Sequence, residues 1–464
     1  MIPANKHTNE AIYQAAPERL VFRTPKGLTR KIVEEISRQK NEPGWMREKR
    51  LKAFAIFEAK PMPQWGVDLS GLRFDDLTFY LRSDKEQFQS WEEVPEDIKK
   101  VYSLLKIPEA EQKWLAGFVG QYESEGFYAK LKKEWEAKGV IFCDTDTALQ
   151  KYPELVKQYF MSRCVPIGDH KFAALHGAVW SGGSFVYIPA GVRVSMPLQT
   201  YFRMNARKSG QFEHTLIIAE EGSFVHYIES CTAPRYSADS LHSAVVEIFV
   251  KKNAHVRYTT IQNWSKDVYN LNTKRAIVYE GGTMEWVGGS MGSKRTMLYP
   301  CSVLLGRGAR ADHINIAVAS KDQWKDTGAK VILAAPDTSA NIISKSIAMH
   351  GGRSSYRGLV KINPGAKRAR VFVRCDALMT SDAQSDTYPY VEVYEQESAV
   401  AHEASCGRIS EEALFYLRAR GMTEKEAQAM IVRGFIEPVT AKLPMDYAVE
   451  LNKLVELEME GAIG

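Results

Sequence analysis

A short strand that follows a turn recurs through the middle of the chain, and this repeat restricts the possible folds more than any other feature of the sequence. Runs rich in Val, Ile, Phe, Tyr and Thr alternate with turns rich in Gly, Asn and Asp. Successive strand starts are spaced by roughly 26 to 33 residues, a range in which a period indicates a solenoid. They fall near Gly222, Ala254, Gly282, Gly308, Ser339, Ala366 and Ala399. A β-sandwich has no reason to keep such a period, so the repeat predicts a right-handed parallel β-helix with stacked coils.

Helical periodicity flanks this repeat on both sides. Apolar side chains recur at helical spacing through residues 28–36. After the repeat, Ser410 is a candidate N-cap, and Thr423 with Glu426 matches a capping box. Helical patterns also occupy the segments 96–107, 122–139, 152–164 and 445–461. The sequence therefore predicts three regions, which are an N-terminal helical region at 1–166, a β-helix at 167–403 and a C-terminal helical region at 404–464.

Composition limits the class of protein. The 464 residues are 45% hydrophobic and 25% charged, which is ordinary for a soluble chain with a large core. The formal net charge of +5 comes without a concentrated basic stripe, so we expect no nucleic-acid binding. No apolar run approaches the length of about 20 residues that a membrane span needs, and the first residues lack the apolar core of a secretory signal. We therefore expect a cytoplasmic protein that is not membrane-bound.

Six cysteines lie at wide spacings, and in a reducing compartment we expect them to stay free. They are Cys143, Cys164, Cys231, Cys301, Cys375 and Cys406. The stretch 373–406 combines Cys375 and Cys406 with His402 and Glu403, and it has no Cys-x-x-Cys pattern of a zinc knuckle. The chain between Cys375 and Glu403 is about one coil long, so these two residues should lie side by side. His402 and Glu403 point to opposite faces of a strand, so only one of them can face Cys375.

Polar residues on two expected strands raise the question of which way they point. Arg203 and Asn205 share one strand face, and Gln262 and Trp264 share another. If these faces point inward, a hydrogen-bonded polar track runs through the solenoid, because buried polar groups need partners. If they point outward, the residues are simply solvated. The pattern alone leaves both alternatives open.

Several motifs together resemble the SufB/SufD family of iron–sulfur cluster assembly scaffolds, over nearly the whole chain. They include NEPGWMREKRLKAFAIF, PMPQWG, GQFEHTLIIAEEGSFVHYIESCTAP, TIQNW, SYRGLVKI and FYLRARGM. The cysteines in ESCTAP and RCDAL are similar to the SufB branch of the family rather than the SufD branch. The resemblance implies a scaffold rather than an enzyme, on which a transient iron–sulfur cluster is built. It also implies a set of partners, which are a SufC-type ABC ATPase on the C-terminal helices, a SufD-type paralogue or a second copy of the chain, a cysteine desulfurase sulfur donor system, and apo iron–sulfur proteins.

The resemblance also assigns roles to individual residues. Cys375 matches the cluster-associated cysteine of the family, Glu403 matches its carboxylate partner in the metal site, and His402 lies beside them. Because Glu403 carries the family match, we expect it rather than His402 to face Cys375. Cys231 matches the cysteine that accepts sulfur. The positions implied to line a sulfur path through the β-helix are Arg203, Asn205, Gln262, Trp264 and Lys274.

The chain departs from the family in one respect. Many chains of the SufB branch carry an N-terminal Cys-x-x-Cys-type motif, whereas this chain has no cysteine before Cys143. Cluster binding is therefore expected to depend on Cys375 and its neighbours. A site with few thiolates and harder oxygen or nitrogen ligands suits a scaffold that must release its cluster.

Alternatives remain at this point. The chain could be a metal-free, SufD-like assembly partner, or a β-helix carbohydrate-active enzyme that uses the carboxylates of DHIN and SDAQSD. The sequence also leaves open the cluster type, the iron source, the use of reduced flavin, and the choice between heterodimer and homodimer.

Overall fold

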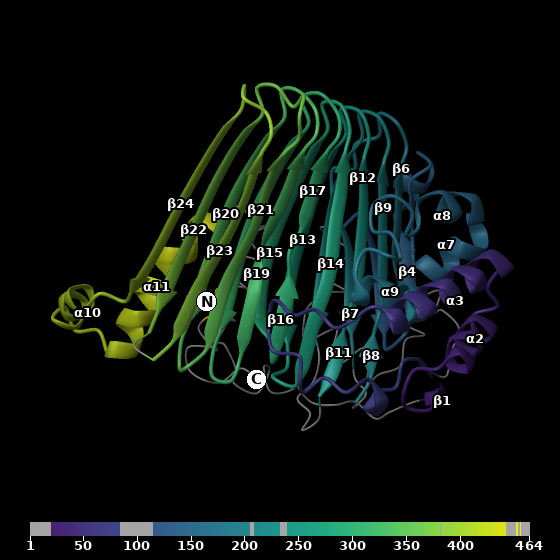
Figure 1. The fold of residues 1–464 in the computed structure, drawn as a ribbon, viewed down its shortest axis with the longest axis horizontal. Coiled ribbons are helices and arrows are strands. Elements are labelled where there is room, and N and C mark those ends of the chain that lie inside the picture. The colour runs from purple at the N-terminus through teal and green to yellow at the C-terminus, as the bar shows by residue number, and fades with distance from the viewer. Residues whose placement is uncertain are drawn as a thin grey trace.

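The computed structural model shows a long β-solenoid with helices at its two ends (Figure 1). Its strands form two large sheets, one of 10 and one of 12 strands, beside a small two-stranded sheet at the N-terminal end. The solenoid has about seven turns, which confirms the β-helix predicted from the repeat. The structure describes residues 20–83, 115–204, 208–232, 239–380 and 382–441, together with Asn452 and Val455.

Strands of successive coils pair in parallel within each sheet. The first sheet contains β3 (Gly117–Tyr122), β4 (Glu125–Leu131), β7 (Leu198–Arg203), β10 (Phe224–Thr232), β13 (His255–Trp264), β15 (Thr283–Gly292), β18 (Arg310–Ala319), β20 (Ser339–Ala348), β22 (Arg370–Met379) and β24 (Ala399–Arg408). The second contains β5 (Ile141–Cys143), β6 (Gly183–Ile188), β8 (Gly210–Gln211), β9 (His214–Ala219), β11 (Ser240–His242), β12 (Val245–Val250), β14 (Val268–Val278), β16 (Arg295–Leu298), β17 (Cys301–Leu304), β19 (Trp324–Leu333), β21 (Arg353–Ile362) and β23 (Gln384–Val393). The pairing order places residues of neighbouring coils directly above one another.

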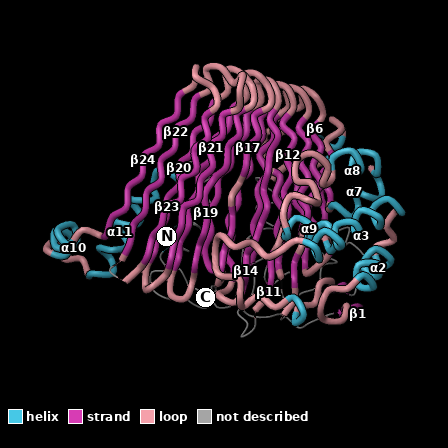
Figure 2. The backbone as a smooth tube through the Cα atoms, in the orientation of Figure 1, coloured by secondary structure: helices cyan, strands magenta, loops and turns pink. Residues whose placement is uncertain are grey.

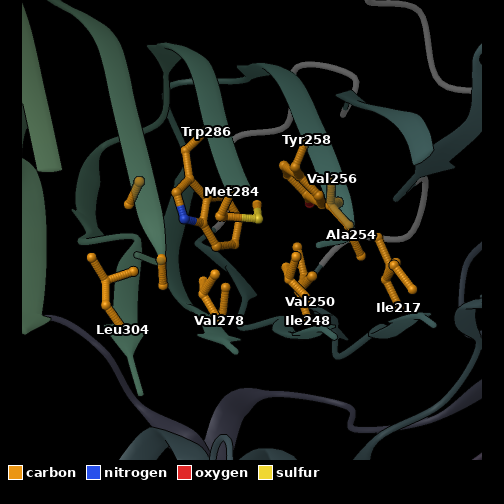
Figure 3. Packing of buried hydrophobic residues seen from close by; sticks show 14 of the residues in the cluster. Ile217, Ile248, Val250, Ala254, Val256, Tyr258, Val278, Met284, Trp286 and Leu304 are labelled. Carbon is orange, nitrogen blue, oxygen red and sulfur yellow. The ribbon is translucent and has the colours of Figure 1, made fainter. Parts of the chain in front are cut away.

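The hydrophobic core fills the space between the two sheets. Val256 and Tyr258 on β13 are in register with Met284 and Trp286 on β15, and all four are buried. Figure 3 shows these side chains facing Val278 and its neighbours from the opposite sheet. Burying a side chain of this size stabilises a fold by about 1.5–3 kcal/mol, so each coil is held by the contacts with the coils on either side.

Helices cover the N-terminal end of the solenoid (Figure 2). The expected helix near residue 30 is present, and its buried side chains include Ile32, Val33 and Ile36. Residues 171–179, inside the range expected for the β-helix, form a helix as well. The elements of this end are β1 (Leu20–Arg23), α2 (Arg30–Gln39), α3 (Gly44–Ala59), η1 (Phe74–Asp76), β2 (Leu81–Ser83), α6 (Lys133–Glu136), α7 (Thr145–Lys151), α8 (Pro153–Tyr159) and α9 (Lys171–Val179).

The prediction of a helix over residues 122–139 is wrong. This segment forms most of the hairpin of β3 and β4, and only the four residues of α6 are helical. The reason is tertiary pairing, because β3 pairs in parallel with β7 and extends the first sheet. Phe118 and Tyr128 are buried in the hairpin. The helix expected over 96–107 lies outside the described residues.

At the other end, α10 (Glu411–Arg418) and α11 (Glu424–Thr440) follow the last strand. The capping box expected from Thr423 and Glu426 is present. Val432 and Ile436 of α11 are buried in one cluster with Ile316 of β18, so α11 packs on the outside of the solenoid. The helical stripe expected over 445–461 lies outside the described residues apart from Asn452 and Val455. Among the helices that the structure describes, none is long and apolar enough to span a bilayer.

A buried carboxyl joins the N-terminal helices to the solenoid. Glu247 on β12 accepts hydrogen bonds from the backbone N–H of Met161 at 2.6 Å and of Val165 at 2.8 Å. Its Oε2 also lies 3.2 Å from Nε2 of His214. Burial raises the pKa of Glu247 to about 7 and holds the pKa of His214 well below its usual range. A protonated Glu247 can therefore donate to a neutral His214.

The raised pKa of Glu247 predicts a stability that falls with pH. Between about pH 4.5 and 7 the folded state holds a proton that the unfolded state has lost, so unfolding becomes easier as the pH rises through this window. The loss should approach about 3 kcal/mol, since one pKa unit corresponds to about 1.4 kcal/mol. We expect Glu247→Leu to be less stable than wild type at pH 5, and this difference to shrink by pH 8. The measurement is chemical denaturation across this range.

The exposed Glu280 provides the control for this experiment, because its side chain is 59% exposed and pairs with Lys252 on the surface. Glu280→Leu should leave the pH profile of wild type unchanged. Parallel profiles for wild type and Glu247→Leu would show that Glu247 does not hold the proton.

Candidate functional site

Cys375 lies on the inner face of β22, close to the C-terminal end of the solenoid. It is only 5% exposed and belongs to the interior cluster with Val371 and Val373. Its Sγ is 3.4 Å from Nε2 of His402. Burial, together with the neighbouring charge of Asp376, raises the pKa of the Cys375 thiol to about 11. Without a cation beside it, this sulfur is therefore a neutral thiol at physiological pH.

The structure corrects the expectation that Glu403 faces this thiol. β22 and β24 are adjacent, with Val373 opposite His402 and Arg374 opposite Glu403. His402 is half-buried on the interior side, whereas Glu403 is exposed on the other face of β24. Only the backbone carbonyl of Glu403 approaches Sγ of Cys375, at 3.7 Å. β24 continues as a regular strand to Arg408, so its side chains alternate between the two faces at His402 and Glu403. The imidazole of His402, and not the carboxylate of Glu403, therefore faces the thiol of Cys375.

The coil that carries His402 is the last one in the solenoid. β24 and β23 each pair with one neighbouring strand only within the described chain, so their outer edges are free. β23 also exposes aromatic side chains, and Tyr390 is 63% exposed. Tyr356 of β21 lies inside the coil, with its ring centroid 6.4 Å from that of His402. Cys375 is thus one strand away from an open, partly apolar end.

Cys231 lies much deeper in the molecule. It is fully buried near the end of β10, in a cluster with Phe202, Met204, Trp264 and Val268. Burial, reinforced by the charge of a carboxylate two residues away, raises the pKa of its thiol well above the usual range. Cys231 and Cys375 are therefore not neighbours, and any joint role requires a connection through the interior.

The polar residues expected along a path are buried rather than solvated. Arg203, Gln262, Trp264 and Lys274 are each at most 1% exposed, and Asn205 lies outside the described residues. The register shows that they do not all share one face. Gln262 is in register with Cys231 on the inner face, whereas Arg203 is in register with Thr232 and lies on the opposite face of its strand.

Lys274 and Arg203 both make buried polar contacts. Lys274 Nζ donates to Oε1 of Glu229 at 3.0 Å and to the hydroxyl of Tyr258 at 3.1 Å, which joins the two sheets. The guanidinium of Arg203 donates to the hydroxyl of Thr232 at 3.4 Å.

Strand register connects this buried region with Cys375. On the inner face of the first sheet, the strand pairing places one residue of each coil directly above one residue of the next, from Glu229 to Cys375. We call this series the inner ladder, and it consists of Glu229, Thr260, Gly288, Asn315, Ser344 and Cys375. Beside it is a cavity of about 20 Å³, lined in part by Thr260, Lys274, Gly288 and Asn315, with room for roughly one water molecule. Sequence reasoning missed these polar members, because only the register shows that they share a column with Cys375.

Comparisons with known proteins agree with this architecture. The family model described as SufBD protein N-terminal region matches residues 34–200, and the model described as SUF system FeS cluster assembly, SufBD core domain, matches residues 202–435. An iron–sulfur cluster assembly SufBD family protein of Staphylococcus aureus is 57% identical over 445 residues, which cover 96% of each chain. A protein of the same description from Staphylococcus epidermidis is also 57% identical over 445 residues, with 96% of each chain covered.

Proposed function

The chain belongs to the SufBD family of iron–sulfur cluster assembly proteins, and from this we propose that it is the SufB-type scaffold, which accepts sulfur and iron and builds a nascent cluster for transfer to apo-proteins. Family membership leaves no support for the carbohydrate-active alternative. The metal-free, SufD-like role remains the competing hypothesis. The presence of thiols at both Cys231 and Cys375 favours the scaffold.

The inner ladder is the observation that carries this proposal. Polar or small residues occupy every coil between Glu229 and Cys375, next to the apolar side chains of the interior cluster. Burying polar groups is unfavourable unless they are hydrogen-bonded, so a continuous column of them needs a reason. Passage of a small polar species between the two cysteines supplies one. Lys274 and Gln262 would stabilise its negative charge near the entry, whereas Arg203 lies on the other face of its strand.

Sulfur would enter at Cys231. Because Cys231 is buried with a raised thiol pKa, this step needs local opening that lets the thiol lose its proton. The Cys231 thiolate then attacks the terminal sulfur of a persulfide on the desulfurase donor system. The S–S bond of the donor breaks, a new S–S bond forms on Cys231, and the donor leaves as a thiolate. Conversion of this sulfur to sulfide requires two electrons, for which reduced flavin is a candidate donor.

The cluster would form at Cys375. We propose the Cys375 thiolate and the His402 imidazole as ligands on the inner face. Glu403, on the opposite face, can add its carboxylate around the free edge of β24. A bound iron would stabilise the thiolate despite burial, since a cation reverses the effect of low polarity on an anion. One thiolate with nitrogen and oxygen ligands holds a cluster less firmly than four thiolates do, which suits a cluster that is transferred to another protein.

The proposed partners map to separate surfaces. A SufD-type paralogue or a second copy of the chain would cover the free edge of β23 and β24, completing the site around Cys375. The SufC-type ATPase would dock on α10 and α11 and supply ATP hydrolysis. We place this assembly in the cytoplasm.

Cells that express the chain with its native partners provide the test. Cys231→Ala should lower the iron and acid-labile sulfide bound to the anaerobically purified complex by roughly tenfold, since the thiol that receives sulfur is gone. Cys301→Ala is the matched control, because Cys301 is also buried but lies away from the inner ladder. Equal cluster content in both variants would remove Cys231 from the mechanism.

Gly288→Ala is a second variant for the same test, and it leaves both thiols in place. A Cβ at this position would lie 3.1 Å from Oδ1 of Asn315 and would narrow the ladder. We expect lower cluster content at an unchanged melting temperature. Gly44→Ala is the control, because a Cβ on Gly44 meets nothing within 4 Å.

A further inference from the structure

Three potential metal ligands converge in the buried region around Cys231. Glu213 precedes β9, Cys231 lies on β10 and His242 ends β11, so three separate segments supply them. One ligand atom from each residue lies within 4.8 Å of the other two. Each of the three residues is at most 1% exposed. We call this set the buried triad.

The hydrogen bonds of His242 direct one ring nitrogen at Glu213. The side-chain amide nitrogen of Asn270 donates to Oε1 of Gln262 at 2.7 Å, which leaves Oδ1 of Asn270 to face the ring. Nδ1 of His242 donates to that oxygen at 2.8 Å. In neutral His242 the lone pair is therefore on Nε2, and this atom contacts a carboxylate oxygen of Glu213. Two acceptors face each other, so a cation or a proton must lie between them.

The second carboxylate oxygen of Glu213 strengthens the case for a cation. This Oε2 is buried and has no hydrogen-bond partner within the described part of the chain. Lys274, the cation that influences Cys231, is already paired with Glu229. The ring of Trp264 packs on His242 with a centroid distance of 4.3 Å and shields the region from water. An unpaired carboxylate in such surroundings is strongly unfavourable, whereas a bound metal ion satisfies it.

We propose that Glu213, Cys231 and His242 bind a divalent transition-metal ion of the Zn²⁺ or Fe²⁺ class. Thiolate, imidazole and carboxylate are the ligands that such ions prefer. Ligand atoms in a tetrahedral site lie about 3.3–3.8 Å apart, so small shifts of the side chains would bring the three ligand atoms to binding distance. The contact of Nδ1 with Asn270 is the second-shell bond that metal-bound histidines make. Three protein ligands leave one position for an exchangeable ligand. Binding releases the thiol proton of Cys231, so the metal ion and incoming sulfur would use this thiol at different times, and the site is distinct from Cys375.

Cobalt(II) binding tests this site directly. The full chain with Cys375→Ser and Cys406→Ser, which removes the thiols of the C-terminal end, is incubated anaerobically with Co²⁺ alone until its absorbance is constant. We expect saturation at one equivalent, with a thiolate-to-cobalt charge-transfer band and the visible bands of a four-coordinate ion. Zn²⁺ should abolish these bands. Asn270→Ala should weaken binding by roughly 10- to 100-fold, as loss of a second-shell partner does.

Matched variants separate ligation from folding. Cys231→Ser should lose the charge-transfer band, whereas Cys301→Ser, also at a buried cysteine, should keep it. Glu213→Gln nearly preserves the shape of the side chain and should weaken binding while the far-UV circular dichroism stays the same. If Co²⁺ does not saturate, if the charge-transfer band persists in a folded Cys231→Ser chain, or if Glu213→Gln binds Co²⁺ as tightly as the parent chain, the triad is not a metal site and Glu213 and His242 share a proton instead.

Discussion

Cys375→Ser is expected to abolish cluster binding in cells, leaving less than about a tenth of the wild-type iron and sulfide, because serine cannot replace the only thiolate proposed for the site. The fold should survive, since serine is close to cysteine in size and Cys375 lies near the open end. The measurement is iron and acid-labile sulfide in the complex purified anaerobically with its native partners. Wild-type cluster content in this variant would refute the assignment.

Variants at His402 and Glu403 distinguish the two faces of β24. The imidazole lies 3.4 Å from Sγ of Cys375, so His402→Ala should lower cluster content by an amount approaching that of Cys375→Ser. Glu403→Ala should have a smaller effect, unless the partner chain draws the carboxylate around the free edge. Cys406→Ser is the control, because Cys406 is an exposed thiol on the same strand. If Glu403→Ala lowers cluster content more than His402→Ala does, Glu403 rather than His402 is the main partner of Cys375, as the sequence predicted.

The second large effect is expected on ATPase docking. Phe415 and Tyr416 on α10 are 75% and 54% exposed, which is unusual for aromatic residues without a partner. Aromatic anchors of this kind often contribute about 2 kcal/mol or more each, so Phe415→Asp with Tyr416→Asp should weaken ATPase binding by on the order of 100-fold or more. Co-purification with the ATPase subunit and titration of the purified partners measure this change.

Point variants are a better test than removal of the C-terminal region. Val432 and Ile436 of α11 pack on the solenoid, so truncation after Cys406 would expose apolar surface and weaken the fold itself. Leu305→Asp is the control, since Leu305 is 46% exposed outside α10 and α11. Unimpaired co-purification of the α10 variant would show that the ATPase binds elsewhere.

The sequence predicted the solenoid well because its signal is repeated in every coil. An error in one turn does not change the period, and the period alone indicates stacked parallel strands. The hairpin of β3 and β4 had no such support. Residues 122–131 were expected to be helical from their local pattern, and only the pairing of β3 with β7, which is far away in sequence, makes this hairpin extended.

Prediction of the site was limited in the same way. Cys375 and Glu403 were expected on adjacent strands, and their strands are indeed adjacent. Which side chain faces inward depends on register to the single residue, and a one-residue difference exchanges His402 for Glu403. Glu213 and His242 carried no visible signal, because they meet Cys231 only through three segments that the fold brings together.

The one-dimensional stacking of the coils has a consequence for cooperativity. In such an array each coil is stabilised by its nearest neighbours, so the terminal coil has about half of the interfaces of an interior coil. It therefore opens locally at a lower free energy than the rest, as the ends of repeat arrays do. In this protein the terminal coil contains His402 and covers Cys375. Fraying of this coil exposes the thiol without global unfolding, and a partner that supplies the missing interface closes it again.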